Sequence, residues 1–209
     1  HLALDAFFAA VEILENPALA GKPVLIGGRP DQRGVVATAS HPARAFGCRS
    51  AMPMAQALKL CPEAIVLPAR HSLYLQYSRR VMDMLHALTP LVEQVSIDEA
   101  FLELTEQVAA WEEAVEIARR LQGRVRAEIG LSASLGVATN KQVAKVASDF
   151  DKPGGLTVVR PAQPRAGQKR LHPRQPHEPR GRFDEEPAEP ASDILEQRQA
   201  TLPEGRAVQ

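Results

Sequence analysis

The stretch Val95-Ser96-Ile97-Asp98-Glu99-Ala100-Phe101 places two adjacent carboxylates between two short apolar runs. Apolar residues alternate with other residues on both sides of the carboxylates, which is the pattern of half-buried β-strands. We therefore predict a β-hairpin over residues 95–101, with Asp98 and Glu99 at or near its tip. Because successive strand side chains point to opposite faces, both carboxylates can serve one site only where the strand ends or bends. A solvated acidic turn is the alternative interpretation of an Asp-Glu pair taken alone.

Short apolar runs separated by turn residues come before this hairpin. An apolar stripe that includes Phe7 and Phe8 predicts a helix that follows a first strand at residues 2–4 and ends at Asn16-Pro17. The density of small elements between residues 21 and 68 favours a small subdomain inserted between larger parts of the chain. Its predicted elements are strands at 24–26, 35–39 and 65–67, and helices at 42–46 and 53–60.

Longer elements begin at His71. Apolar residues recur at helical spacing over 74–88 and again over 111–129, and Gly130 is typical of a helix end. Asn140 is a candidate N-cap for a helix with Val143, Val146 and Phe150 on one side. With strands at 131–137 and 156–159, the order of elements predicts an α+β sheet with its helices on one face.

Residues 160–209 differ in kind from the rest. They hold eight of the 17 prolines and 17 charged residues, but only six Val, Ile, Leu, Met or Phe residues. Such a segment buries too little apolar area to offset its ordering entropy, so we predict that it is disordered. The whole chain, 209 residues long, therefore has room for one domain of ordinary size plus this tail.

Composition and charge limit the class of protein. The formal net charge is zero, and no uncharged apolar run is long enough to span a bilayer. Cys48 and Cys61 lack the spacing of a metal site, and no positively charged flank marks a signal peptide, so we expect a reduced, cytoplasmic setting without a membrane. The chain begins with His1 rather than Met, which favours a fragment or a processed product.

Four blocks of the sequence resemble the Y-family DNA polymerases, and among them the bacterial DNA polymerase IV group. The match covers residues 1–159, and the blocks stand in the order and spacing of that family. They are His1–Glu12, Thr38–Arg44, Ser96–Ala100 and Ala144–Gly155.

The resemblance implies a domain plan and an activity. Residues 1–20 and 69–159 would form the palm, a ferredoxin-like sheet that carries the catalytic hairpin, and residues 21–68 would form the fingers. The thumb and the C-terminal DNA-binding domain of the family are not visible in residues 160–209. The implied activity is template-directed, error-prone DNA synthesis across lesions, a nucleotidyl transfer in DNA repair and damage tolerance.

The resemblance also implies a metal site. Phosphoryl transfer needs positioned groups and neutralised charge, which two Mg²⁺ ions about 3.5–4 Å apart can supply. Magnesium prefers hard oxygen ligands. Asp98 and Glu99 would therefore be the catalytic and metal-binding residues, with Glu99 holding the ion nearest the primer 3′-hydroxyl.

Four further residues are implied to bind the nucleotide. Phe8 resembles the steric gate that excludes a ribose 2′-hydroxyl, with packing beside Phe7 as the alternative. Arg44 and Lys145 would contact the triphosphate, Arg through paired hydrogen bonds and Lys as a point charge. His41 stands where the family usually has Tyr, and its imidazole would donate to phosphate in a pH-dependent way. Solvated surface charges are the alternative for Arg44 and Lys145, and a simple helix-entry residue is the alternative for His41.

One position departs from the family pattern. Ala3 stands where the family has an Asp that ligates the metals, and a methyl group cannot ligate Mg²⁺. Asp5 has the same strand parity, but it matches a separate acidic position of the family. We therefore expect little or no polymerase activity from this chain. Residues 1–159 carry a net charge of −1, so we also expect weak binding to duplex DNA, because affinity for duplex comes largely from basic contacts.

Three other functions compete with a polymerase. A truncated, catalytically inactive palm and fingers fragment is favoured by Ala3 and by the missing thumb. A nucleotide cyclase shares a palm-like sheet, but its Gly-Gly-acidic-Glu-Phe hairpin is not found here. A Rossmann domain is disfavoured because no glycine-rich turn links a strand to a helix. For the polymerase, the expected partners are primer–template DNA and deoxynucleoside triphosphates, with a sliding clamp as a further candidate for the full-length protein, and we expect a monomer.

Overall fold

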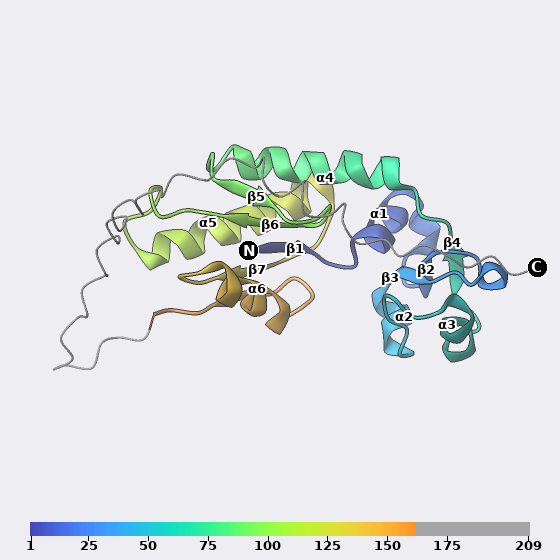
Figure 1. Cartoon of the computed structure of the whole chain (residues 1–209). Helices are drawn as coiled ribbons and strands as arrows, with labels where there is room; N and C mark the ends of the chain where they lie inside the picture. The colour runs from blue at the N-terminus through green and yellow to red at the C-terminus, as the bar shows by residue number, and fades with distance from the viewer. Residues whose placement is uncertain (162–209) are drawn as a thin grey trace, which may run out of the picture. The chain divides into compact units, whose positions relative to one another are not determined.

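The computed structural model describes residues 1–161 (Figure 1). Its larger sheet has five strands in the order β5-β6-β1-β7-β8. The first strand of the chain lies in the middle and pairs antiparallel with both of its neighbours, whereas β8 is parallel to β7. The strands are β1 (Leu2–Leu4), β5 (Val92–Gln94), β6 (Glu99–Leu102), β7 (Ala133–Val137) and β8 (Leu156–Val158). This mixed sheet with helices confirms the predicted α+β class.

Two long helices cover one face of this sheet. The helices α4 (His71–His86) and α5 (Trp111–Arg124) pack on a core that includes Leu2, Leu4 and Leu135. After α5 a π-helical turn, Val125–Ile129, ends at Gly130, whose φ is 86°. As predicted, Gly130 terminates the helix, because glycine reaches positive φ without steric cost.

The helix α6 (Lys141–Phe150) lies against the opposite face, as Figure 1 shows, so the expectation that all helices share one face is wrong for α6. Its backbone sits directly on β7, where a Cβ added to Gly136 would lie 2.0 Å from the Ala144 carbonyl oxygen. The small residues Ala144, Ala147 and Ser148 face the sheet. The apolar side chains expected on one side of this helix point outward instead: Val146 is 71% exposed and Phe150 84% exposed.

Residues 24–67 form a second, three-stranded sheet in the order β3-β2-β4. It has a core of its own that includes Leu25, Val36 and Met54, together with Cys48 and Cys61, which are both free thiols. Ser40 caps α2 by accepting a hydrogen bond from Ala43 N. The elements are β2 (Val24–Gly27), β3 (Val36–Ala39), α2 (His41–Ala45), α3 (Met54–Leu60) and β4 (Ile65–Leu67).

An ion pair between a buried carboxylate and a half-exposed guanidinium joins the helix α1 (Phe7–Glu15) to the start of α4. The Glu12 side chain is 5% exposed. Arg70 Nε donates to Glu12 Oε1 at 2.9 Å, Arg70 Nη2 donates to Oε2, and the Tyr74 hydroxyl donates to Oε1 at 2.6 Å. Burial raises the pKa of Glu12, but the bonds from Arg70 and Tyr74 outweigh it and hold the pKa below its usual value. Burial, and then the bond to Glu12, raise the pKa of Tyr74 to about 12.

No helix within residues 1–161 is both long enough and apolar enough to cross a membrane. The predicted disorder of residues 160–209 concerns a segment that lies, from residue 162 onward, outside the described part of the chain.

The Glu12 pair gives a stability prediction. Replacing Glu12 by Gln removes the charge that faces Arg70 and replaces one of the two buried acceptor oxygens by an NH₂ donor, so the free energy of unfolding should fall by about 2 kcal/mol. The control is Glu15→Gln. Glu15 accepts from Tyr77 at an exposed position, and its loss should cost less than about 0.5 kcal/mol. Urea denaturation at pH 7 measures both, and equal losses would contradict the prediction.

The same pair predicts a dependence on pH. Because the native pKa of Glu12 lies below its ordinary value of 4.5, its contribution is complete above that value and is lost as the pH falls through the native pKa. The difference in stability between the wild-type chain and Glu12→Gln should therefore shrink as the pH is lowered below 4.5. Denaturation curves at pH 7 and at successively more acidic values test this directly.

Candidate active site

The two carboxylates of the hairpin stand where the chain turns from β5 into β6. Val95 N and Ser96 N both donate to the Glu99 carbonyl, at 2.9 and 3.2 Å, which closes the turn. Ser96 Oγ donates to Asp98 Oδ1 at 2.7 Å and accepts from Asp98 N at 3.3 Å. Glu99 is the first residue of β6, and Asp98 is the last residue of the turn before it. This local bend meets the condition under which adjacent carboxylates can serve one site.

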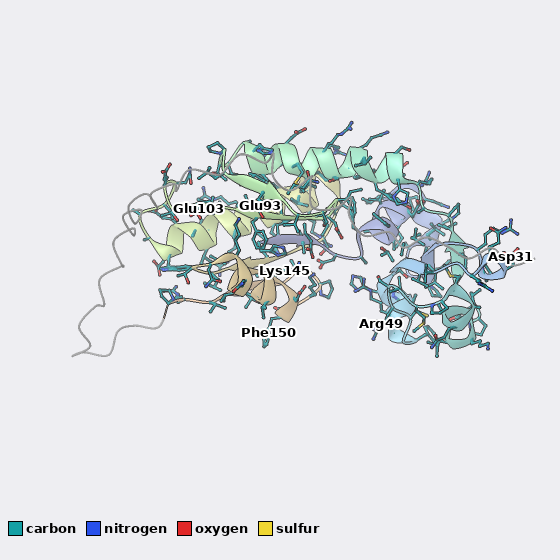
Figure 2. All side chains as sticks on the ribbon, in the orientation of Figure 1. Asp31, Arg49, Glu93, Glu103, Lys145 and Phe150 are labelled. Atoms are coloured by element: carbon teal, nitrogen blue, oxygen red, sulfur yellow. The ribbon has the colours of Figure 1, made fainter. Side chains whose placement is uncertain are left out.

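Glu99 lies within a group of basic side chains. Lys145 Nζ, from α6, donates to Glu99 Oε2 at 2.5 Å, and His1 Nε2 lies 3.9 Å from the same oxygen. The Glu99 side chain is 24% exposed, and that of His1 is fully buried. Ser148 and Phe101 hold the His1 ring. Its Nδ1 is 2.8 Å from Ser148 Oγ, and its centroid is 4.5 Å from the centroid of the Phe101 ring. Figure 2 shows Lys145 on α6, the helix that lies against the sheet.

Ala3 lies directly opposite Glu99. The β1–β6 register pairs these two residues, and the β1–β7 register pairs Ala3 with Ser134. Paired residues of an antiparallel ladder point to the same face, so the Ala3 methyl group points to the face that carries the Glu99 carboxylate. Ala3 is 1% exposed. The missing carboxylate is therefore a buried methyl group next to Glu99.

Asp5 does not replace it. Its side chain accepts from Ser132 Oγ and Ser134 Oγ, each at 2.7 Å, and from Gly154 N at 2.9 Å. Asp5 is 4% exposed. These bonds tie the end of β1 to β7 and to the turn before β8, so the carboxylate is fully used in holding the fold.

Phe8 is the half-exposed member of the Phe7-Phe8 pair. Phe7 is 2% exposed and belongs to the core. The Phe8 ring stacks on Tyr74, with centroids 4.3 Å apart and planes 13° apart, and meets His71 edge-on at 5.8 Å. Phe8 is thus a rigid aromatic platform supported by α4, with part of its surface open.

The other two predicted nucleotide ligands lie on α2. Arg44 Nε donates to the Ala39 carbonyl at 2.9 Å, so its guanidinium is oriented by the end of β3. His41, the first residue of the helix, is exposed. Among the hydrogen bonds and ion pairs of residues 1–161, neither side chain contacts Asp98 or Glu99. The structure therefore brings Lys145 to Glu99, whereas Arg44 and His41 lie on α2, which follows a strand of the smaller sheet.

The donor set determines which metal could bind. Asp98 and Glu99 offer hard carboxylate oxygens, which suit Mg²⁺. Within the described residues, no cluster of three His, Cys, Asp or Glu side chains could hold a metal ion. Asp98 and Glu99 alone would offer a divalent ion two carboxylates, and the pair of ions that the resemblance implies would need further ligands.

Comparison with known proteins identifies the family. The sequence profile of the impB/mucB/samB family matches residues 2–149. The chain belongs to this family. The resemblance to Y-family polymerases is thereby confirmed.

Curated proteins of similar sequence are named DNA polymerase IV. A protein of Ralstonia nicotianae named DNA polymerase IV is 48% identical over 163 residues, which are 78% of this chain and 46% of that protein. A Listeria monocytogenes protein of the same name is 45% identical over 166 residues, or 79% of this chain and 47% of the relative. The chain thus spans about half the length of the curated relatives it matches.

Solved structures give the same result. The crystal structure of DinB from Sulfolobus solfataricus superposes with a TM-score of 0.74 at 37% identity, covering 77% of this chain and 47% of that one. The insertion ternary complex of Dbh DNA polymerase superposes with a TM-score of 0.73 at 38% identity, covering 77% of this chain and 48% of that one.

Three residues near the site were not found from the sequence. Ser96 bonds to Asp98, and its place inside the hairpin motif could have suggested it. Tyr74 supports Phe8, but in the sequence it is one of many apolar residues at helical spacing. His1 reaches Glu99 only because β1 and β6 are paired, and the sequence pattern does not specify which strands pair.

The contrast between Asp5 and Asp98 is testable. Asp5→Asn replaces one buried acceptor oxygen by a donor that faces a serine hydroxyl or the Gly154 N–H, so it should lower the free energy of unfolding by about 2–3 kcal/mol. Asp98→Asn changes a half-exposed turn residue and should cost less than about 0.5 kcal/mol. Urea denaturation compares the two variants. A larger loss for Asp98→Asn would contradict the assignment of Asp5 as structural.

Proposed function

We propose that this chain is the palm and fingers part of a translesion DNA polymerase, with residues 1–20 and 69–159 as the palm and 21–68 as the fingers. One observation carries the proposal: Asp98 and Glu99 are adjacent at the bend where the chain turns from β5 into β6. The family supports it, as do the relatives named DNA polymerase IV. The proposed substrates are deoxynucleoside triphosphates and primer–template DNA.

The proposed site acts by positioning and by neutralising charge, since phosphoryl transfer asks for little covalent chemistry from the protein. Asp98 and Glu99 would hold Mg²⁺, which when bound neutralises charge on the triphosphate. Lys145 would move from Glu99 to the triphosphate once the charge of Glu99 is met by the metal. Arg44 and His41 would add donors from α2.

Phe8 would set the choice of sugar. Its stacked ring cannot give way easily, because Tyr74 lies 4.3 Å behind it. A sugar lying against such a ring has no room for an additional 2′-hydroxyl. A cytoplasmic location, binding to a sliding clamp and a monomeric state stay predictions.

A second candidate function is a fragment that binds nucleotide but does not catalyse. Ala3 favours it, because it removes the donor that a second metal ion would need. The bond from Lys145 to Glu99 favours it too, since the ammonium group neutralises the carboxylate that the metal would use. Together they explain why we expect little activity from the chain as it stands.

Restoring the carboxylate tests both candidates. Ala3→Asp places a third carboxylate opposite Glu99, so affinity for Mg²⁺ with a deoxynucleoside triphosphate should rise at least about tenfold. Without metal the variant should be less stable than the wild-type chain, because the new charge is buried beside a like charge, and Mg²⁺ should restore its stability by mass action. Ala3→Asn, of the same shape but uncharged, is the control: it shares the cost of placing a larger polar side chain in a buried position, but it should show neither the gain in affinity nor the recovery of stability with Mg²⁺.

The readouts are thermal melting with and without Mg²⁺, nucleotide binding by calorimetry, and primer extension. Extension by Ala3→Asp but not by the wild-type chain would support a polymerase site disabled at one position. Binding without extension would support the non-catalytic fragment. If Mg²⁺ fails to stabilise Ala3→Asp relative to Ala3→Asn, the metal site is not at Asp98 and Glu99.

Removing the Phe8 ring tests the sugar assignment. In the Ala3→Asp background, Phe8→Ala should raise the use of ribonucleotides relative to deoxynucleotides by about 10²-fold or more, because the obstacle to the 2′-hydroxyl is gone. Phe150→Ala is a matched control, since this aromatic side chain is exposed at the end of α6 and points away from the sheet (Figure 2). Unchanged discrimination in Phe8→Ala would remove the assignment.

A further inference from the structure

One buried nitrogen beside Glu99 has no hydrogen-bond partner. Within residues 1–161, His1 Nε2 is the only buried side-chain nitrogen or oxygen that lacks one. The His1 side chain is fully buried, and its Nε2 lies 3.9 Å from Glu99 Oε2. Buried polar atoms of folded proteins are nearly always paired, and each exception needs an explanation. The unpaired nitrogen therefore calls for a donor that reaches it in another state of the site.

The hydrogen bonds of Ser148 determine which ring nitrogen of His1 carries the proton. Ser148 Oγ lies 2.7 Å from the Lys145 carbonyl oxygen and 2.8 Å from His1 Nδ1. Because a carbonyl only accepts, the single hydroxyl proton of Ser148 belongs to the bond with Lys145. Ser148 therefore accepts from the Nδ1–H group of His1. The neutral imidazole then has a bare lone pair at Nε2.

Two acceptors thus face each other without a proton between them, His1 Nε2 and Glu99 Oε2. In a buried place such a pair is unfavourable unless a donor serves both atoms. Lys145 has donors to spare, because its ammonium group carries three N–H groups. Among residues 1–161 its hydrogen bond goes to Glu99 Oε2, at 2.5 Å. An ammonium with unused donors and an imidazole with an unused acceptor therefore lie around the same carboxylate oxygen.

The His1 ring is held in this position by contacts with three elements. Its backbone pairs with Gly136 of β7, whose N donates to the His1 carbonyl at 2.9 Å. The ring packs against Phe101 of β6, with the centroids 4.5 Å apart. Through Ser148 of α6, Nδ1 is linked to the backbone carbonyl of Lys145 itself. The imidazole is thus fixed relative to the residue whose side chain binds Glu99.

We propose that His1 is a positioning residue for Lys145. When the Glu99 carboxylate is taken by a divalent ion, the Lys145 ammonium loses that acceptor and donates one N–H group to His1 Nε2. A second N–H group then reaches the triphosphate of a bound nucleotide, and the ammonium charge stays in the site. In this role His1 contacts neither the substrate nor the metal. The role rests on the proposed function, because it requires a metal at Glu99 and a nucleotide beside it.

The exchange of acceptors is testable in the metal-free chain, without any activity. In the full chain labelled with ¹⁵N-histidine, the His1 signals are those that disappear in His1→Asn. At alkaline pH they should show a proton on Nδ1 and none on Nε2. Glu99→Met keeps the length of the side chain and removes its acceptors, so Lys145 should donate to His1 and shift the Nε2 signal to lower frequency. Glu99→Met combined with Lys145→Met is the control and should show no such shift.

Three results would overturn the proposal. The first is a proton on Nε2 in the wild-type chain, since that nitrogen could not then accept. The second is an Nε2 signal that stays in place in Glu99→Met. The third is an equal shift with and without the Lys145 ammonium group, because the donor would then be a different group.

Two variants of His1 separate the roles of its nitrogens. Gln can place an amide oxygen near the position of Nε2, whereas Asn can place an NH₂ donor near Nδ1 and leaves no acceptor at Nε2. In the Ala3→Asp background, His1→Asn should lower the affinity for Mg²⁺ with a deoxynucleoside triphosphate about tenfold relative to His1→Gln, because a hydrogen bond to a charged group is lost. Calorimetry measures both.

Equal affinity in His1→Asn and His1→Gln would overturn the positioning role, since a merely structural histidine gives no reason for Gln to bind nucleotide better than Asn. If the Ala3→Asp chain itself binds no nucleotide, the proposed function fails instead. The ¹⁵N signals of Glu99→Met then decide by themselves whether His1 accepts from Lys145.

Discussion

The pairing of β1 with both β6 and β7 is the constraint on which the rest of this fold depends. Three residues long, β1 lies in the middle of the sheet, and its two registers decide what meets on each face. On one face they bring Leu2 and Leu4 to the core under α4 and α5. On the other they place Ala3 between Glu99 and Ser134. The bonds of Asp5 to Ser132, Ser134 and Gly154 N fix this register at the point where β1 ends.

The charge of Glu99 is compensated by a cation of the protein, whereas Asp98 has a neutral hydroxyl as its donor. Glu99 has Lys145 at 2.5 Å, and Asp98 has the Ser96 hydroxyl at 2.7 Å. With an alanine methyl group in place of a third carboxylate, no excess of negative charge is buried between β1 and β6. A cation that entered would have to compete with an ammonium group already in contact, which lowers its apparent affinity without any change in the hairpin.

The sequence predicted local structure well because local signals are strong. The cap at Asn140, the helix end at Gly130 and the strand positions follow from residues that act within a few positions of themselves. The side on which α6 packs against the sheet could not be predicted from its sequence, because Val143, Val146 and Phe150 form the more apolar side of that helix. The side that packs is made of Ala144, Ala147 and Ser148, and only the absence of a side chain at Gly136, on a different element, makes that close approach possible. The contacts of Lys145 and His1 with Glu99 also join residues far apart in the sequence. They could not be predicted without knowing which strands pair and in which register.

The fold accommodates alanine at position 3 for a physical reason. Ala3 lies on β1 and Asp5 directly after its end, and their surroundings differ. Asp5 has three hydrogen-bond donors in a buried place, so its charge is compensated by the protein itself. A carboxylate at position 3 would be nearly buried beside Glu99, and its charge would need a metal to compensate it. Alanine there removes a repulsion that the fold alone cannot offset. Alanine at position 3 is therefore compatible with the fold, whereas loss of the Asp5 carboxylate should lower stability.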